Sequence, residues 1–429
     1  MERALICGWF DIQEKAVDIA LVLGELKALA ETAGAEVTGQ FFQKRAKPDR
    51  RLLIGQGKAG EIKLAAHAQD ANLIIFYNIL NHMQQRNLED FFSIKVIDRT
   101  RLILDIFAQR ARSMEGKLQV ELAQMLYLLP RLTGKGTTLS RLGGGIGTRG
   151  PGETKLEADR RTIKKRISLI RDRLTQVMKN RDVQRKNRKV MPVPLVSLVG
   201  YTSAGKSTLF QTLTGEDVFI SPMLFSTLDP LLRRVDLAEI EPGYSFLLSD
   251  TVGFIRSMPN ELFTSFKATL EEVVQADFVL HVVDITNPDY LNQKREVEKV
   301  LAQLDVSPEK IITVFNKIDL LDQSEDLLEK KGDREVYVSA RDGMGIDRLK
   351  RLVFDRHFGD YQRFHVEIPE QQLSLESISH WAIVTGKNRT DDGIIQLEVL
   401  SPREKMAQFM EKLSGDQTET TETDHHGIN

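Results

Sequence analysis

The segment "LVSLVGYTSAGKST", residues 195–208, decides the fold of the central part of this 429-residue chain. An apolar run ends at Gly200, and Gly200 to Ser207 follow the pattern G-x-x-x-x-G-K-[ST], which is typical of a phosphate-binding loop between a strand and a helix. Glycines let backbone N–H groups converge on anionic oxygens, and the N-terminus of the next helix adds partial positive charge. The segment therefore predicts a P-loop fold.

Each residue of this loop has an expected contact with a nucleoside triphosphate. Lys206 is expected to reach the β- and γ-phosphates, and the Ser207 hydroxyl to bind Mg²⁺ directly. The predicted loop contacts are Gly200, Tyr201, Thr202, Ser203, Ala204, Gly205, Lys206, Ser207 and Thr208.

Three further stretches indicate that the base is guanine. "DTVG" begins at Asp250, which suits a carboxylate holding Mg²⁺ through water and a Gly253 amide near the γ-phosphate. In "NKID" (Asn316 to Asp319), the Asp319 carboxylate can accept hydrogen bonds from the N1–H and exocyclic amine of guanine, which adenine does not offer. "VSA" (residues 338–340) is expected to bring a backbone amide to the guanine O6.

The order and spacing of these motifs predict a Ras-like, translation-factor-type GTPase domain. Lys206, Asp250, Asn316 and Ser339 follow one another at separations of 44, 66 and 23 residues. The remaining predicted GTP contacts are Phe225, Ser226, Thr227, Asp250, Thr251, Val252, Gly253, Asn316, Lys317, Asp319, Ser339, Ala340 and Arg341.

The expected catalytic residues are Lys206, Thr227 and Gly253. Thr227, in "SPMLFSTLDP", is the candidate switch threonine, which would bind Mg²⁺ and the γ-phosphate. Ras-like proteins place a water-orienting glutamine after the switch glycine, but this chain has Phe254 there. We therefore expect slow hydrolysis by the isolated protein. A partner or a rearrangement of residues 253–272 would complete the site, although another residue of this chain remains an alternative.

The flanking parts of the chain predict an α/β protein of several domains. Residues 1–100 alternate helix-like segments with the apolar runs "RALIC", "GAEVTGQFF", "RLLIG", "NLIIFY" and "IKVID", which indicates a small parallel α/β domain. Residues 101–190 predict a helical hairpin around a glycine-rich loop at 143–153, with one helical run from Thr100 to Leu129 and a second to about Lys189. The second run carries an apolar stripe at Leu156, Ile163, Ile167, Ile170, Leu174 and Val177. Residues 191–358 form the predicted GTPase domain, 359–414 a small α+β domain, and 415–429 a disordered tail.

Composition indicates the cellular compartment. The single cysteine, Cys7, excludes a disulfide framework, argues against a metal cluster and suits a reducing compartment. The stretch "MERALICGWFDIQEKAVDIA" lacks a basic segment followed by an apolar run, and no run of about 18 apolar residues occurs, so we expect a cytoplasmic protein without a membrane span. We also expect a monomer.

Positive charge is concentrated beside the glycine-rich loop. The whole chain is nearly neutral, with 59 basic and 61 acidic residues, yet residues 155–190 hold fourteen Lys or Arg and four Asp or Glu. This excess predicts contact with nucleic-acid phosphates. The candidate RNA contacts are Arg149, Arg160, Arg161, Lys164 and Lys165.

The stretches "GGGIGTRGPGETKLEADRR", "GYTSAGKST", "LFSTLDP", "DTVGFI" and "FKATLEE" closely resemble the HflX family of ribosome-associated GTPases. The resemblance covers roughly residues 1–355 and implies binding to the large ribosomal subunit and splitting or rescue of stalled 70S ribosomes under stress. It also implies a glycine-rich loop that reaches towards the peptidyl-transferase centre, with association to ribosomes or peripherally to a membrane. Family members usually carry asparagine where this chain has Ser203, which leaves a K⁺ requirement open. The quoted stretches end before residue 359, and from the sequence alone we do not match the residues after it to the family.

Two other functions stay open from the sequence. One is an RNA-binding factor for ribosome assembly or RNA modification that uses GTP as a checkpoint. The other is an ATP-driven RNA-unwinding activity of the N-terminal domain. For the second, "LLIGQGKAGEI" (residues 52–62) supplies glycines and Lys58 but no full phosphate-loop pattern, and we expect it to be a strand followed by a helix N-terminus.

Overall fold

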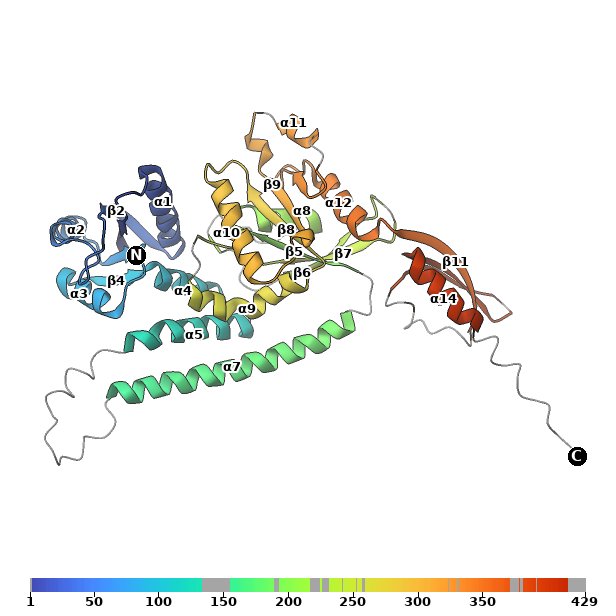
Figure 1. Cartoon of the computed structure of the whole chain (residues 1–429), viewed down its shortest axis with the longest axis horizontal. Helices are drawn as coiled ribbons and strands as arrows, with labels where there is room; N and C mark the ends of the chain where they lie inside the picture. Colours follow the sequence, from blue (N-terminus) through green and yellow to red (C-terminus); the bar gives the residue numbers. More distant parts are fainter. Residues whose placement is uncertain are drawn as a thin grey trace, which may run out of the picture.

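Three β-sheets follow one another along the chain, and helices pack around them (Figure 1). This computed structural model describes residues 2–132, 155–188, 193–216, 224–225, 231–240, 242–251, 253–256, 259–322, 324–329, 332–370, 378, 381–390 and 392–415. The predicted α/β fold class is confirmed, with a mainly parallel six-stranded sheet in the centre and a smaller antiparallel sheet at the C-terminal end.

The N-terminal sheet is parallel, in the order β2-β1-β3-β4. Helices cover both of its faces, which explains why the short central strand β3, "LIIF", is buried throughout. The elements are β1 (Glu2–Phe10), α1 (Ala16–Thr32), β2 (Ala35–Lys44), α2 (Gln56–Ala68), β3 (Leu73–Phe76), α3 (His82–Phe92) and β4 (Lys95–Asp98).

The expected strand at "RLLIG" is wrong, because residues 51–55 form a turn before α2. The Asp49 carboxylate accepts hydrogen bonds from the main-chain N–H groups of Arg51 and Leu52, and Leu53 has a φ of 65°. The apolar side chains of Leu52, Leu53 and Ile54 are nevertheless buried in the core beneath α2. The apolar character of this run therefore reflects burial and not strand pairing.

The helical hairpin is present, but its first arm is two helices. The arm consists of α4 (Arg99–Arg110) and α5 (Met114–Leu128), followed by the 3-10 turn η1 (Leu129–Leu132), and the second arm is α7 (Lys155–Arg188). The continuous run expected from Thr100 is interrupted because Ser113 caps α5, its hydroxyl accepting a hydrogen bond from Gly116 N.

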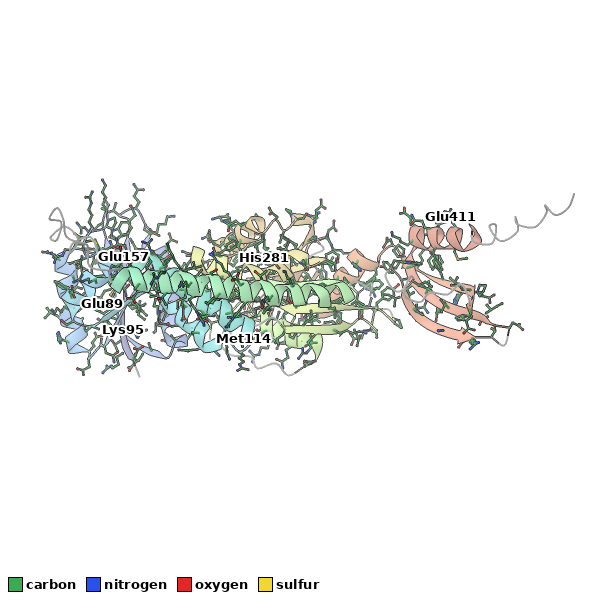
Figure 2. All side chains as sticks on the ribbon, turned by 90° about the horizontal axis from the view of Figure 1, so that it is seen from below. Glu89, Lys95, Met114, Glu157, His281 and Glu411 are labelled. Atoms are coloured by element: carbon green, nitrogen blue, oxygen red, sulfur yellow. The ribbon has the colours of Figure 1, made fainter. Side chains whose placement is uncertain are left out.

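The two arms lie antiparallel and side by side (Figure 1). Ile167, Ile170 and Leu174 of α7 are buried against Leu118 and Leu122 of α5, as the apolar stripe predicts. Figure 2 shows α7 running lengthwise along the molecule, with Glu157 near its beginning. The predicted loop at 143–153 and the side chain of Leu156 lie outside the described residues.

The central sheet has the order β10-β9-β8-β5-β7-β6, and β6 is its antiparallel edge strand. Its strands are β5 (Leu195–Gly200), β6 (Leu231–Asp236), β7 (Ser245–Asp250), β8 (Phe278–Asp284), β9 (Ile311–Asn316) and β10 (Glu335–Tyr337). The helices around it are α8 (Lys206–Thr214), α9 (Asn260–Gln275), α10 (Tyr290–Gln303), α11 (Ser324–Glu329) and α12 (Ile346–Phe358), with the 3-10 turns η2 (Pro308–Lys310) and η3 (Ile318–Leu320). Parallel strands bring their carboxyl ends to one edge, where ligands bind in folds of this kind.

The C-terminal part is a three-stranded antiparallel sheet with one helix, in agreement with the predicted α+β class. The sheet has the order β11-β13-β12, and Ile368, Ile395 and Val399 form part of its buried core. The elements are β11 (Tyr361–Pro369), β12 (Ile383–Arg389), β13 (Ile394–Pro402) and α14 (Arg403–Gly415). The predicted disordered tail beyond Gly415 lies outside the described residues.

Candidate nucleotide site

The glycines of the P-loop are required by close approaches of the backbone. Gly205 has a φ of 93°, and a Cβ added there would lie 2.2 Å from Asn316 Nδ2. A Cβ added at Gly200 would lie 2.3 Å from the main-chain oxygen of Val282. The loop therefore runs directly against β8 and the end of β9, with no room for a side chain at these two positions.

Lys206 begins α8, and its side chain folds back over the loop. Its Nζ donates hydrogen bonds to the carbonyl oxygens of Gly200 at 3.1 Å and Tyr201 at 2.9 Å. The ammonium is buried, and this burial lowers the pKa of Lys206 to about 8, although the nearby Asp250 carboxylate acts in the opposite direction. A buried cation at this position is suited to bind phosphate.

Ser207 and Asp250 provide a donor set that fits Mg²⁺. The Ser207 hydroxyl donates to Asp250 Oδ2 at 3.3 Å, so Ser207 in the first turn of α8 lies beside Asp250 at the end of β7. A hydroxyl and a carboxylate are oxygen ligands of the kind that Mg²⁺ prefers. The predicted ligand Thr227 and the predicted contacts Ser226 and Val252 lie outside the described residues.

The segment after Asp250 is bound to the P-loop through its main chain. Thr202 N donates to Phe254 O at 2.8 Å, and Phe254 N donates to Gly200 O at 3.0 Å. A Cβ built at Gly253 would lie 3.0 Å from Thr202 Cγ2 and 3.1 Å from Lys206 Nζ. Gly253 is thus held next to the lysine that is expected to bind the terminal phosphates.

The Phe254 side chain points into the core. It is 2 % exposed and belongs to the buried cluster that includes Tyr201, Leu270 and Val273. Since this side chain is apolar and enclosed by other residues, it neither orients a water molecule nor accepts a proton.

Asn316 joins the P-loop to the segments that are expected to bind guanine. Its Nδ2 donates to Ala204 O at 2.9 Å, and its Oδ1 accepts from Ala340 N at 3.0 Å. Lys317 adopts a left-handed conformation with a φ of 69°, and its Nζ pairs with Asp284 Oδ2 at 2.6 Å. Asp284 is a supporting residue that the motif analysis missed, because it lies at the end of β8 and outside every motif.

The tertiary structure thus brings most predicted nucleotide residues to one edge of the central sheet. The P-loop, Asp250, Gly253, Asn316 and Ala340 are joined by the contacts above. Asp319 lies in η3, two residues after the Lys317 that Asp284 supports.

The predicted RNA contacts lie apart from this site. Arg160, Arg161, Lys164 and Lys165 are exposed on α7, while Ile167 and Ile170 of the same helix are buried against α5. The fifth candidate, Arg149, lies outside the described residues.

Sequence reasoning also missed two residues of the N-terminal part. The Glu25 carboxylate accepts a hydrogen bond from the Tyr201 hydroxyl at 2.6 Å, and Arg99 Nη2 donates to Arg256 O at 2.6 Å. Glu25 and Tyr201 are 176 residues apart, and no local pattern signals their contact.

Comparison with known proteins relates the chain to GTPases along most of its length. Residues 21–108 match the family described as "GTP-binding GTPase N-terminal", residues 110–188 match "GTP-binding GTPase Middle Region", and residues 195–317 match "50S ribosome-binding GTPase". The chain is 50 % identical over 349 residues to the GTPase HflX of Caldanaerobacter subterraneus subsp. tengcongensis, covering 80 % of each chain. It is 41 % identical over 405 residues to the GTPase HflX of Escherichia coli, covering 94 % of each. This alignment extends past residue 359, so the expectation that the C-terminal part does not match the family is wrong.

No helix among the described residues combines the length and the apolar character needed to cross a membrane.

Proposed function

The chain belongs to the HflX family of GTPases, and from this membership we propose that it binds the large ribosomal subunit and splits or rescues stalled 70S ribosomes. The protein is a GTP-hydrolysing enzyme. The name "50S ribosome-binding GTPase" of the family that residues 195–317 match supports the choice of partner.

Within the nucleotide site we propose the following roles. Lys206 binds the β- and γ-phosphates, Gly253 N donates to the γ-phosphate, and Asp319 selects guanine. Ser207 and Thr227 would hold Mg²⁺, with Asp250 acting through water, and the ion would neutralise charge on the phosphates. The 3.3 Å contact between Ser207 and Asp250 supports this assignment. A K⁺ requirement stays an open prediction because of Ser203.

The single observation that carries partner-stimulated catalysis is the burial of Phe254. This residue occupies the place of the water-orienting glutamine, but its side chain packs against Leu270 and Val273 in the core. We propose that contact with the ribosome supplies or moves the missing group into the site, so that hydrolysis accelerates only on the correct particle.

The exposed face of α7 is the proposed RNA-binding surface. Its apolar stripe is buried against α5, which leaves Arg160, Arg161, Lys164 and Lys165 exposed. Cations on a rigid helix can neutralise rRNA phosphates, and we propose that Arg149 in the glycine-rich loop adds a contact deeper in the RNA. We expect the protein to act as a cytoplasmic monomer that associates with ribosomes.

The experiment is GTP hydrolysis by the full chain alone and with 50S, 30S or 70S particles, repeated with a variant that lacks Gly147 to Gly152. We expect strong stimulation by 50S or 70S particles and loss of that stimulation on deletion of the loop. Equal slow turnover in every mixture would contradict the proposal. Stimulation by precursor particles or free RNA alone would favour an assembly or modification factor.

A matched pair of charge variants tests the RNA-binding surface. Replacing Arg160 and Arg161 with Ala should weaken 50S binding and reduce the salt dependence of the affinity by about one unit of slope per lost phosphate contact. Replacing Arg295 and Lys299, two exposed cations on α10, should leave both quantities unchanged. Equal effects of the two pairs would contradict a specific role for α7.

A further inference from the structure

Four residues form a polar cluster between the N-terminal part and the GTPase part, and we call it the interdomain cluster: Glu25, Arg99, Tyr201 and Arg256. The Glu25 carboxylate accepts from Arg99 Nη2 at 2.8 Å and from the Tyr201 hydroxyl at 2.6 Å. Burial and the Glu25 carboxylate hold the pKa of Tyr201 above its usual range, so the hydroxyl keeps its proton and remains a donor. The side chains of Arg99 and Glu25 are only 6 % and 18 % exposed.

The interdomain cluster holds both main-chain polar groups of Arg256. Arg256 N donates to the Tyr201 hydroxyl at 2.7 Å, and Arg256 O accepts from Arg99 Nη2 at 2.6 Å. The Arg256 side chain pairs with Asp289 at the start of α10. The backbone at Arg256 is therefore fixed from three sides.

This fixed residue lies three positions after Gly253. Phe254, the residue directly after Gly253, is fixed as well, because its main chain is hydrogen-bonded to Thr202 and Gly200 of the P-loop. Gly253 is consequently held beside Lys206, so that a Cβ built on Gly253 would lie 3.1 Å from Lys206 Nζ. The interdomain cluster thus stabilises the position of two groups that are expected to bind the γ-phosphate.

Apolar contacts join the same two parts of the chain. Phe107 of α4 makes edge-to-face contacts with Phe225 at 4.6 Å between ring centroids and with Phe266 of α9 at 5.0 Å. Phe225 directly precedes the predicted switch residues Ser226 and Thr227, and Leu224 N donates to Thr32 Oγ1 at 3.3 Å. The N-terminal part therefore contacts both segments that are expected to respond to the γ-phosphate.

We propose that Glu25 and Arg99 are positioning residues that raise the preference of the site for GTP over GDP. GDP has no γ-phosphate and gains nothing from a prepositioned Gly253, whereas GTP does. By reciprocity of binding, GTP then strengthens the contact between the two parts of the chain, so the N-terminal part senses which nucleotide is bound. The inference rests on GTP binding at the P-loop and not on the ribosomal partner.

The test compares the Kd of the non-hydrolysable analogue GppNHp with the Kd of GDP, both with Mg²⁺ and the full chain, for Glu25→Ala and Glu25→Gln. For Glu25→Ala we expect the analogue to bind about 5- to 20-fold more weakly while GDP changes less than about twofold, within the range of typical coupling between sites. Glu25→Gln should show a smaller shift in the same direction, because its Oε1 still accepts from Arg99. It also keeps the test available if the alanine variant does not fold.

The matched control is Glu31→Gln. Glu31 is a half-exposed carboxylate on the same helix. It pairs with Lys27 at 3.7 Å, and both residues of this ion pair belong to α1. We expect both Kd values of the control to equal those of the wild-type chain. Equal weakening of GDP and the analogue by Glu25→Ala would show a merely structural role. An unchanged ratio, or tighter binding of the analogue, would likewise overturn the proposal.

Discussion

The substitution Gly205→Ala tests whether Asn316 links the P-loop to the segments that are expected to bind guanine. Gly205 has a φ of 93°, and its new Cβ would lie 2.2 Å from Asn316 Nδ2. Asn316 would have to turn away, which breaks its hydrogen bonds with Ala204 O and Ala340 N. Gly215 is a matched control, because its φ is 70° and a Cβ there meets nothing within 4 Å.

The expected energies follow from these two geometries. A left-handed backbone costs an alanine about 1–2 kcal/mol, and both variants carry this cost. Only Gly205→Ala also breaks two buried hydrogen bonds, each at about 1–2 kcal/mol when its groups are left unsatisfied. Gly205→Ala should therefore be less stable than Gly215→Ala by about 2–4 kcal/mol.

Hydrogen exchange of peptides from β5 and α8 measures this difference as a local opening free energy, without requiring the whole chain to unfold in one step. GDP titrations provide the second measurement. We expect Gly205→Ala to bind GDP at least about 30-fold more weakly than Gly215→Ala, which corresponds to about 2 kcal/mol. If the two variants lose equal stability and equal affinity for GDP, the role of Asn316 as the link between the P-loop and Ala340 is refuted.

Three further predictions concern single residues. GDP affinity should stay constant below about pH 8 and decline above it, because burial lowers the pKa of Lys206 to about 8 and only the charged amine attracts phosphate. Calorimetric titrations that show no decline in affinity by about pH 9.5 would contradict this. Burial lowers the pKa of His281 to about 3, so the unfolded chain binds a proton that the folded chain does not, and stability should fall as the pH decreases below about 6.5. The variant His281→Leu should flatten this slope in urea unfolding, and an unchanged slope would assign it to other groups. Asp98→Asn should cost about 3 kcal/mol in the same assay, because the buried carboxylate accepts from Tyr127 and Arg131, and a loss below about 1 kcal/mol would show that Arg131 is satisfied without it.

The sequence alone determined the chemistry of the central site, because that chemistry is encoded locally. The spacing of glycines and Lys206 predicts a phosphate loop, and "NKID" predicts guanine recognition. Apolar periodicity predicted the face of α7 that packs on α5, because a helix places residues three and four apart on one side.

Local patterns gave wrong predictions where a buried apolar segment can adopt more than one backbone conformation. The run "RLLIG" is apolar because it fills the core beneath α2, yet its backbone forms a turn. The helical run from Thr100 is divided at Ser113, whose cap is a single side-chain hydrogen bond that periodicity does not register.

Only the tertiary structure decided how the N-terminal part meets the nucleotide site. Glu25 and Tyr201 are 176 residues apart, and no local sequence pattern around either residue predicts their contact. Their contact depends on how two surfaces that are distant in the chain pack against each other, which is set by the shape and charge of both surfaces. For that reason the motifs predicted the residues that are expected to bind GTP, while only the folded chain located the residues that hold Arg256 beside them.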